Sequence, residues 1–348
     1  MDIADLLAFT VKHKASDLHI SAGLPPMIRV DGEIRRLNVD ALDYKATTDL
    51  VYSTMNDNLR RDFEADLNVD FSYDIKGMAR FRVNAFHHDR GLGCVFRVIP
   101  EEILSLEDLE APKIFREMIM VPRGLFLVTG PTGSGKSTTL AAMVNHLNVN
   151  TAGHILTIED PIEFVHQSKK CLINQREVHR DTKSFNDALR AALREDPDII
   201  LVGELRDRET ISLALTAAET GHIVFATVHT SSAPKTIDRI IDAFPAGEKP
   251  MVRSMLSESL RAVVTQTLLK RKSGGRVAAH EIMIANSAIR NLIREDKVAQ
   301  MYSVIQTSNN IGMITLDASL ENLVKRGIIS NKEAAGKAQN KRNFQAAA

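Results

Sequence analysis

Residues 125–138 read Leu-Phe-Leu-Val-Thr-Gly-Pro-Thr-Gly-Ser-Gly-Lys-Ser-Thr, and a helical pattern follows over residues 140–147. This order of apolar strand, glycine-rich loop, Lys-Ser pair and helix predicts a loop that binds nucleotide phosphates. The glycines let the backbone turn sharply and aim its N–H groups inward, and the helix adds the partial positive charge of its N-terminus. We expect ATP or GTP to bind through Gly130, Pro131, Thr132, Gly133, Ser134, Gly135, Lys136, Ser137 and Thr138.

The Lys-Ser pair has two separate roles in this prediction. Lys136 supplies a mobile positive charge for the β- and γ-phosphates, and Ser137 offers a hydroxyl that completes the coordination of a Mg²⁺ ion. An ordinary glycine-rich turn is the structural alternative, but it does not require strand, loop, Lys-Ser pair and helix in this order. The sequence therefore predicts nucleotide and magnesium binding.

Length and composition favour a cytoplasmic protein of two domains. At 348 residues the chain exceeds the usual size of a single hydrophobic core. Its 44 basic residues balance 44 acidic ones, so no global field marks a nucleic-acid coat or a membrane-attracted surface. Cys94 and Cys171 are far apart, which favours a reducing compartment and excludes a four-cysteine zinc module. Because no apolar run approaches about 18 residues and no signal sequence is recognisable, we expect no transmembrane segment.

We expect residues 1–100 to form a small α+β domain around an antiparallel sheet. Polar and apolar residues alternate strictly over residues 68–75, which is the period of a half-buried strand. The next strand continues the alternation and places Arg80 and Arg82 together on an exposed face. Further strands are predicted at residues 94–99, after a turn at 89–93, and at residues 27–30 and 33–37, around an Asp31-Gly32 turn.

Residues 101–121 have a loosely helical pattern between two prolines, Pro100 and Pro122, and we predict a linker or hinge there. The second domain, residues 122–348, alternates apolar strands with helical stretches. This alternation predicts an α/β fold with a covered parallel sheet, as in a RecA-like core. Its further strands are predicted at residues 155–158, 199–202 and 223–228. Beyond about residue 250 we expect a mainly helical lobe that includes an amphipathic helix at residues 287–295.

The predicted strand at residues 199–202 ends in Gly203-Glu204. A nucleotide-binding fold holds an acidic residue near its metal ion at this point. Because glycine occupies the strand end and Glu204 follows it, we expect Glu204 to contact Mg²⁺ through water. A solvated glutamate in a charged turn is the structural alternative.

Three carboxylates, Glu159, Asp160 and Glu163, follow another predicted strand, and Pro161 fixes the turn between them. Carboxylates at the carboxyl ends of parallel strands lie at the ligand crevice, where one of them can orient the water that attacks the γ-phosphate. We choose Glu163 as this base, and the spacing leaves Asp160 open. A charged surface turn is the ordinary alternative.

His222 and His229 bracket the predicted strand at residues 223–228. Because they stand at opposite ends of that strand, they are poorly placed to bind one metal ion, and we do not expect a zinc site. His229 lies at the carboxyl end, where its ring could sense the γ-phosphate by hydrogen bonding. A purely structural histidine is the alternative.

These motifs occur together and in order, and in this combination the chain resembles the secretion and type IV pilus ATPase superfamily. Residues 15–21, Ala-Ser-Asp-Leu-His-Ile-Ser, and residues 288–295, Ala-Ile-Arg-Asn-Leu-Ile-Arg-Glu, are similar to the pilus retraction ATPases of PilT type. The resemblance runs nearly from end to end. Extension and secretion relatives usually carry a longer N-terminal region and a four-cysteine zinc insertion, and this chain shows neither.

The resemblance implies a homo-hexameric ring whose subunits join an N-terminal PAS-like domain to a RecA-like ATPase domain. It also implies an ATP-hydrolysing motor that drives pilus retraction at the cytoplasmic face of the inner membrane. A pilus platform protein and a paralogous retraction ATPase are the implied partners. In this family arginines reach the nucleotide from the N-terminal domain or a neighbouring subunit, and Arg80, Arg82 and Arg97 are the candidates for offsetting transition-state charge. A solvated basic strand face is their alternative.

The amphipathic helix at residues 288–295 has two interpretations. Ile289, Leu292 and Ile293 form an apolar stripe opposite Arg290, Asn291 and Arg294. The stripe is either the packing face of an ordinary helix or, as the resemblance suggests, part of a docking surface specific to retraction.

Other functions remain open at this stage. Within the superfamily they are pilus extension, type II secretion, and a regulatory ATP-binding subunit that hydrolyses little itself. RecA-like cores also drive DNA strand exchange, but the net charge of zero, the absence of Trp and the lack of aromatic residues along a basic stripe argue against nucleic acid. Because all candidate catalytic carboxylates are present, we rank an active motor above a regulatory subunit.

Overall fold

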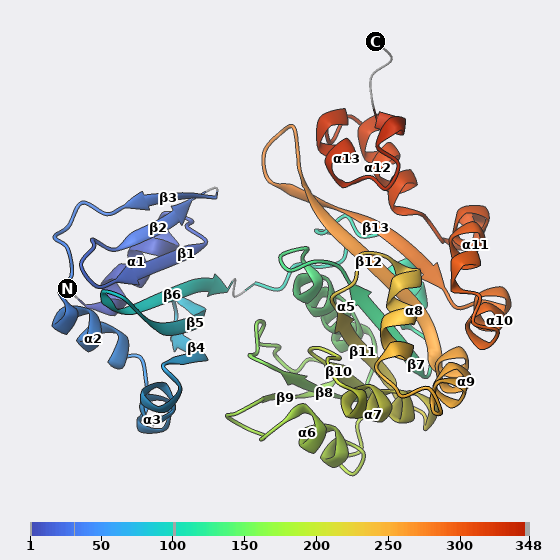
Figure 1. Cartoon of the computed structure of the whole chain (residues 1–348), viewed down its shortest axis with the longest axis horizontal. Helices are drawn as coiled ribbons and strands as arrows, with labels where there is room; N and C mark the ends of the chain where they lie inside the picture. The colour runs from blue at the N-terminus through green and yellow to red at the C-terminus, as the bar shows by residue number, and fades with distance from the viewer. Residues whose placement is uncertain (1, 31, 100–101, 345–348) are drawn as a thin grey trace. The chain divides into compact units, whose positions relative to one another are not determined.

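The computed structural model describes residues 2–30, 32–99 and 102–344, and the chain divides into two compact units (Figure 1). The first unit comprises Met1–Glu102 together with a short later segment, Pro161–Val165. The second comprises Ile103–Asp160 and His166–Ala348. Asp31, in the predicted hairpin turn, and Pro100 and Glu101, in the predicted hinge, lie outside the described residues.

The first unit is built on a six-stranded sheet with the order β3-β2-β1-β6-β5-β4, in which every pair is antiparallel. The strands are β1 (Asp17–Ser21), β2 (Met27–Val30), β3 (Glu33–Arg36), β4 (Asn68–Ile75), β5 (Ala79–His88) and β6 (Gly91–Ile99). The helices of its described part are α1 (Ile3–Lys12), α2 (Tyr44–Tyr52) and α3 (Asp57–Asp66). The side chains of Phe63, Phe81 and Phe96 are fully buried in its core, and the α+β prediction is confirmed.

Each helix of this unit begins at a residue that caps it. The side chains of Asp2, Asp43 and Asn56 accept hydrogen bonds from backbone N–H groups in the first turns of α1, α2 and α3. Those N–H groups have no partner within the helix, so the caps favour helix formation at these points.

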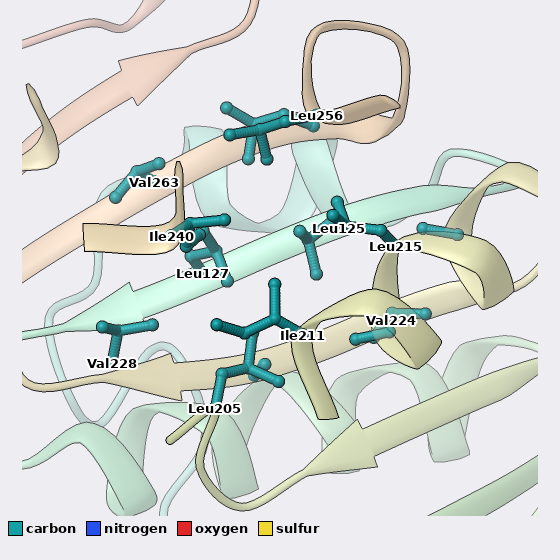
Figure 2. Close-up of a cluster of buried hydrophobic side chains, with 14 of the residues drawn as sticks. Leu125, Leu127, Leu205, Ile211, Leu215, Val224, Val228, Ile240, Leu256 and Val263 are labelled. Atoms are coloured by element: carbon teal, nitrogen blue, oxygen red, sulfur yellow. The ribbon is translucent and has the colours of Figure 1, made fainter. Parts of the chain in front are cut away.

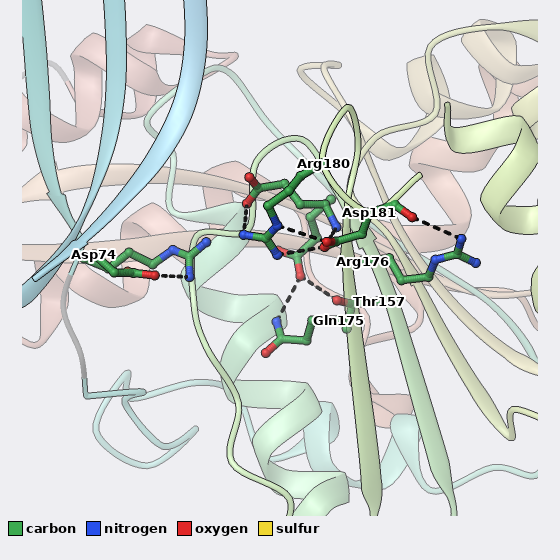
Figure 3. Close-up of polar contacts among 9 residues, drawn as sticks. Asp74, Thr157, Gln175, Arg176, Arg180 and Asp181 are labelled. Carbon is green, nitrogen blue, oxygen red and sulfur yellow. Dashed lines mark hydrogen bonds and ion pairs between the residues drawn. The ribbon is translucent and has the colours of Figure 1, made fainter. Parts of the chain in front are cut away.

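Two details of the β4–β5–β6 meander correct the sequence prediction. The turn expected at residues 89–93 is shorter, because Gly91 already pairs with His88 and only two residues connect β5 to β6. Arg80, predicted on an exposed face, is 9% exposed. It stands opposite Asp74 of β4, and its guanidinium lies 3.2 Å from that carboxylate (Figure 3). Burial of the arginine is tolerated because the charge has a partner.

The second unit contains a seven-stranded sheet with the order β13-β12-β7-β11-β10-β8-β9. Neighbouring strands from β12 to β9 run parallel, and β13 is antiparallel to β12. The strands are β7 (Gly124–Thr129), β8 (His154–Glu159), β9 (Leu172–Glu177), β10 (Ile199–Val202), β11 (Ile223–Val228), β12 (Leu260–Lys270) and β13 (Arg276–Ile284). The predicted α/β fold with a RecA-like parallel core is confirmed.

Helices cover both faces of this sheet (Figure 1). The helices of the described part of this unit are α4 (Ile114–Ile119), α5 (Lys136–Asn150), α6 (Phe185–Ala192), α7 (Arg208–Glu219), α8 (Ala233–Asp242), α9 (Lys249–Ser259), α10 (Ser287–Arg294), α11 (Met301–Thr307), α12 (Leu316–Lys325) and α13 (Asn331–Lys337), with short 3-10 turns η1 (Val298–Gln300), η2 (Asn309–Ile311) and η3 (Lys341–Phe344). Successive strand residues point to opposite faces, so Leu125 and Leu127 join one core cluster while Phe126 and Val128 join the other. Figure 2 shows the first cluster, in which Leu125 and Leu127 lie among side chains such as Leu215 and Ile240.

The prediction of a mainly helical region beyond residue 250 is correct for α9 to α13, and the predicted amphipathic helix is α10. It misses β12 and β13, which are two of the longest strands of the sheet. β12 is rich in Val and Thr, whose branched side chains favour strands. The two strands form a hairpin that projects to α12 and α13 (Figure 1), where Leu269 and Val277 pack against Leu320.

The described part of the segment predicted as a linker, residues 102–121, contributes packed side chains to the second unit from Leu106 onward. Leu106, Phe115 and Ile119 are buried in the same core cluster as Phe126 of β7. Apolar side chains that can be buried on a sheet face do not remain in a free hinge, because burial of each contributes about 1.5–3 kcal/mol. Ile103 and the residues that follow it, up to Asp160, accordingly belong to the second unit.

Candidate nucleotide site

The glycine-rich loop connects β7 to α5, and three of its glycines have backbone angles that other residues rarely adopt. The φ values of Gly130, Gly133 and Gly135 are +140°, +77° and +87°. A Cβ atom on Gly130 would lie 2.4 Å from the carbonyl oxygen of Gln266. The loop therefore needs glycine for its conformation and, at Gly130, also for the space that the neighbouring strand leaves.

Lys136 is the first residue of α5 and is 8% exposed. Its ammonium donates hydrogen bonds to the carbonyl oxygens of Gly130, at 3.0 Å, and Pro131, at 3.2 Å. These contacts hold the positive charge against the loop, beside the first N–H groups of the helix. Ammonium, loop N–H groups and helix N-terminus together favour a bound anion, and phosphate is the anion that such a cradle fits.

Gln266 of β12 contacts this loop and was not among the residues predicted for the site. Its side-chain N–H donates to the carbonyl oxygen of Ser134 at 2.6 Å, and its side-chain oxygen accepts from the hydroxyl of Thr139 at 2.9 Å. Because the region around Gln266 was expected to be helical, nothing in the sequence pattern placed it next to the loop.

Glu204 and His229 follow two neighbouring parallel strands, β10 and β11, and the structure brings them together. The Nε2 atom of His229 lies 3.6 Å from a carboxylate oxygen of Glu204, whose other oxygen accepts from Arg206 at 2.8 Å. The hydroxyl of Thr227 donates to the carbonyl of Gly203 at 2.6 Å and so fixes the end of β10. Gly203 itself leaves room for β8, since a Cβ there would lie 3.3 Å from the Ile158 carbonyl oxygen.

Glu159 is held as a fixed group at the end of β8. One of its carboxylate oxygens accepts from the hydroxyl of Thr157 at 2.7 Å and from the side-chain amide of Gln175 at 3.2 Å (Figure 3). The other end of the Gln175 amide accepts from the backbone N–H of His166 at 2.7 Å. Gln175 thus links the two points at which the chain leaves the second unit after Asp160 and returns to it at His166.

His166 marks the return point with a half-buried imidazole. Burial, and secondarily the charge of Lys169, lowers the pKa of His166 to about 4, so the ring is neutral at physiological pH.

Glu163 and the three candidate arginines belong to the first unit, whereas the loop, Glu204 and His229 belong to the second. The guanidinium of Arg82 lies 3.5 Å from the carboxylate of Glu163. The guanidinium of Arg97 lies 3.0 Å from the carboxylate of Asp17, which is largely buried. Arg80 forms its own ion pair with Asp74. Their roles toward the nucleotide stay predictions.

His222, at the other end of β11, has a local contact. Its Nδ1 atom lies 2.9 Å from the carbonyl oxygen of Ala217, near the end of α7. Within residues 2–30, 32–99 and 102–344, the His, Cys, Asp and Glu side chains form no group of three that could hold a metal ion. The Ser137 hydroxyl and the Glu204 carboxylate, predicted to serve Mg²⁺, are of the hard oxygen type that this ion prefers, and their roles stay predictions.

The helix at residues 288–295 is α10, and its apolar stripe is occupied. Ile289, Leu292 and Ile293 are buried in the same core cluster as the β7 leucines, while Asn291 and Arg294 are exposed. The stripe is therefore a packing face, and only the polar side of α10 remains available to a partner.

Comparison with known proteins identifies the relatives of this architecture. The family model for the type II/IV secretion system protein matches residues 2–274. The chain belongs to this family.

Within it, the chain is of the PilT type. It is 66% identical to the Pseudomonas aeruginosa "Type IV pilus retractation ATPase PilT" over 99% of this chain and 100% of that protein. It is 61% identical to a Neisseria gonorrhoeae "Twitching motility protein" over 90% of this chain and 84% of that protein. A crystal structure of the pilus retraction motor PilT with bound ADP has a TM-score of 0.91 and 45% identity, and the match covers 99% of this chain and 98% of that one. The predicted family is confirmed, and the chain is a nucleotide-binding ATPase. No helix in the described part of the chain combines the length and apolar character needed to span a bilayer.

Proposed function

We propose that this protein is an ATP-hydrolysing motor that powers type IV pilus retraction by pilin depolymerisation, and with it twitching motility. The observation that carries the proposal is the match along essentially the whole chain to a pilus retraction ATPase at 66% identity. The phosphate loop supports it, because Lys136 and the loop N–H groups form a cradle that fits a polyphosphate.

In the proposed reaction the loop would hold the β- and γ-phosphates of ATP, and Ser137 would coordinate Mg²⁺, with Glu204 contacting the ion through water. The ion would neutralise charge that develops on the phosphate oxygens. Glu163 orients the attacking water, and Asp160 is the alternative base. His229 senses the γ-phosphate, and its contact with Glu204 links that sensing to the metal side of the site. Arg80, Arg82 and Arg97 are the candidates for offsetting transition-state charge.

The assembly that we propose is a homo-hexamer at the cytoplasmic face of the inner membrane, bound to a pilus platform protein and acting beside a paralogous retraction ATPase. ATP hydrolysis and γ-phosphate sensing would be coupled to mechanical work by rotation of one domain against the other as the nucleotide site closes.

The test is complementation of type IV piliated cells that lack their retraction ATPase. We expect the wild-type chain to restore twitching, and Lys136→Ala and Glu163→Gln to leave cells piliated but unable to twitch. Glu219→Gln, which changes an exposed glutamate at the end of α7, is the matched control and should restore twitching fully. Normal twitching with Lys136→Ala would contradict a motor that depends on this site.

The same cells separate the other functions. An extension or secretion ATPase would restore surface pili or secretion in strains that lack those motors, and not twitching here. A regulatory subunit would restore twitching only beside an active paralogue, with Lys136→Ala as effective as the wild type. A nucleic-acid motor would hydrolyse ATP faster when single- or double-stranded DNA is added.

A further inference from the structure

Gln266 is a buried polar side chain that the proposed reaction does not use. It is 1% exposed and lies on β12, one residue beyond the paired residues Thr265 and Thr129. Its amide makes two hydrogen bonds, one to the carbonyl oxygen of Ser134 in the phosphate loop and one from the hydroxyl of Thr139 on α5. A buried amide with no partner would be destabilising, so these two bonds account for a polar group at this position.

The orientation of the amide follows from its partners. The Ser134 carbonyl can only accept, so the nitrogen of Gln266 must face it, and the side-chain oxygen is left to accept from Thr139. The loop is also shaped to admit Gln266 closely. A Cβ on Gly135 would lie 3.0 Å from the Gln266 side-chain nitrogen, and one on Gly130 would lie 2.4 Å from its backbone oxygen.

The bond to Ser134 fixes more than one carbonyl. A trans peptide is planar, and its C=O and N–H groups point in opposite directions. When Gln266 holds the Ser134 carbonyl toward β12, the N–H of Gly135 is turned away from β12. Gly135 is the residue before the first turn of α5, where N–H groups bind phosphate oxygens in such loops.

We propose that Gln266 is a positioning residue, whose amide holds the phosphate loop and the first turn of α5 in the orientation that binds phosphate. This inference rests on the nucleotide site of the proposed function. If the bond to Ser134 is absent, rotation of that peptide turns a carbonyl dipole toward the anion and removes an N–H donor from it. A loop that already has the binding orientation binds phosphate more tightly, because less conformational entropy is lost when the ligand binds.

Gln266→Glu is the sharpest variant. It keeps the size of the side chain and an oxygen for Thr139, but it cannot donate to the Ser134 carbonyl when ionised. We expect the dissociation constant for a fluorescent ADP analogue to rise about tenfold, the effect of losing one well-placed hydrogen bond. The KM for ATP should rise with it.

A merely structural role predicts a different result. Leu269→Ala is the matched control, because it opens a cavity on the same strand without touching the loop. It should lower the thermal midpoint at least as much as Gln266→Glu while leaving ADP affinity within about twofold of the wild type. The inference is overturned if Gln266→Glu binds ADP like the wild type, or if Leu269→Ala weakens ADP binding equally.

The other end of the amide gives a second test that holds even if Gln266→Glu fails to fold. Thr139→Val removes the hydroxyl that Gln266 accepts from, and Thr139→Ser retains it. We expect the first to weaken ADP binding about threefold and the second to match the wild type. Equal affinities for the two variants would overturn the inference. A wild-type protein that binds no ADP would instead refute the proposed function.

Discussion

Replacing Gly130 and Gly133 by alanine, one at a time, tests whether the loop geometry is set by its surroundings or only by glycine flexibility. Both residues have positive φ, +140° and +77°, so both variants carry backbone strain. Their surroundings differ. A Cβ on Gly133 meets nothing within 4 Å, whereas one on Gly130 lies 2.4 Å from the backbone oxygen of Gln266, which belongs to a sheet strand and cannot move aside.

The expected cost of Gly133→Ala is the strain alone, about 1–2 kcal/mol. In Gly130→Ala the backbone strain costs about 1–3 kcal/mol and the clash with the Gln266 oxygen costs about 1–3 kcal/mol more. The free energy of unfolding should therefore fall by about 4 kcal/mol in total. At about 2–4 °C per kcal/mol, the thermal midpoint of the nucleotide-free protein should fall roughly 5 °C for Gly133→Ala and roughly 12 °C for Gly130→Ala. Differential scanning fluorimetry measures both, with ADP titrations beside it. If Gly133→Ala is the more damaged protein, or if Gly130→Ala keeps both its midpoint and its ADP affinity, the steric argument is refuted.

Three further predictions concern buried groups that are not part of the phosphate loop. Burial lowers the pKa of His280 from its ordinary value of 6.5 to about 4, so the free energy of unfolding falls as the pH drops below 6.5, by about 2 kcal/mol at about pH 5. His280→Gln should make this decline shallower when unfolding in urea is measured at several pH values. An unchanged dependence of the unfolding free energy on pH would contradict the prediction. Burial raises the pKa of Glu281. The contribution of its protonated carboxyl group to the free energy of unfolding is therefore complete below the ordinary pKa and is lost as the pH rises through the raised pKa. Glu281→Gln should therefore stabilise more at about pH 8 than at about pH 4.5, and an equal effect would refute the assignment. Ile293→Ala should lower the free energy of unfolding by about 2–5 kcal/mol, whereas Asn291→Ala, at an exposed position, should leave it almost unchanged. Similar unfolding midpoints for the two variants would argue against the packing role of α10.

The phosphate loop and the parallel strands could be predicted because their signals are local. Strand β7, the glycines and Lys136 follow one another directly, and each apolar strand is bounded by residues that end it. Their burial confirms what the hydrophobic pattern indicates, since strands covered on both faces read as continuous apolar runs.

The remaining features depend on contacts between distant segments. β12 has mixed helix and strand preference, and pairing with β7 and β13 decides for strand. Gln266 reaches the loop across more than a hundred residues of sequence, and Arg80 is buried because Asp74 stands opposite it. The assignment of Pro161–Val165 to the first unit has no local signal either, since it depends on which partners that segment packs against.

The central claim is that this chain hydrolyses ATP at the described site as part of an oligomeric motor. Steady-state ATPase rate per subunit, measured against protein concentration with Mg²⁺ and with Glu163→Gln as the background, tests it most directly. We expect a rate that rises from near zero to a plateau as subunits assemble, and a loss of about 10²–10⁴-fold in Glu163→Gln. A wild-type rate no higher than this background at any concentration would contradict the claim.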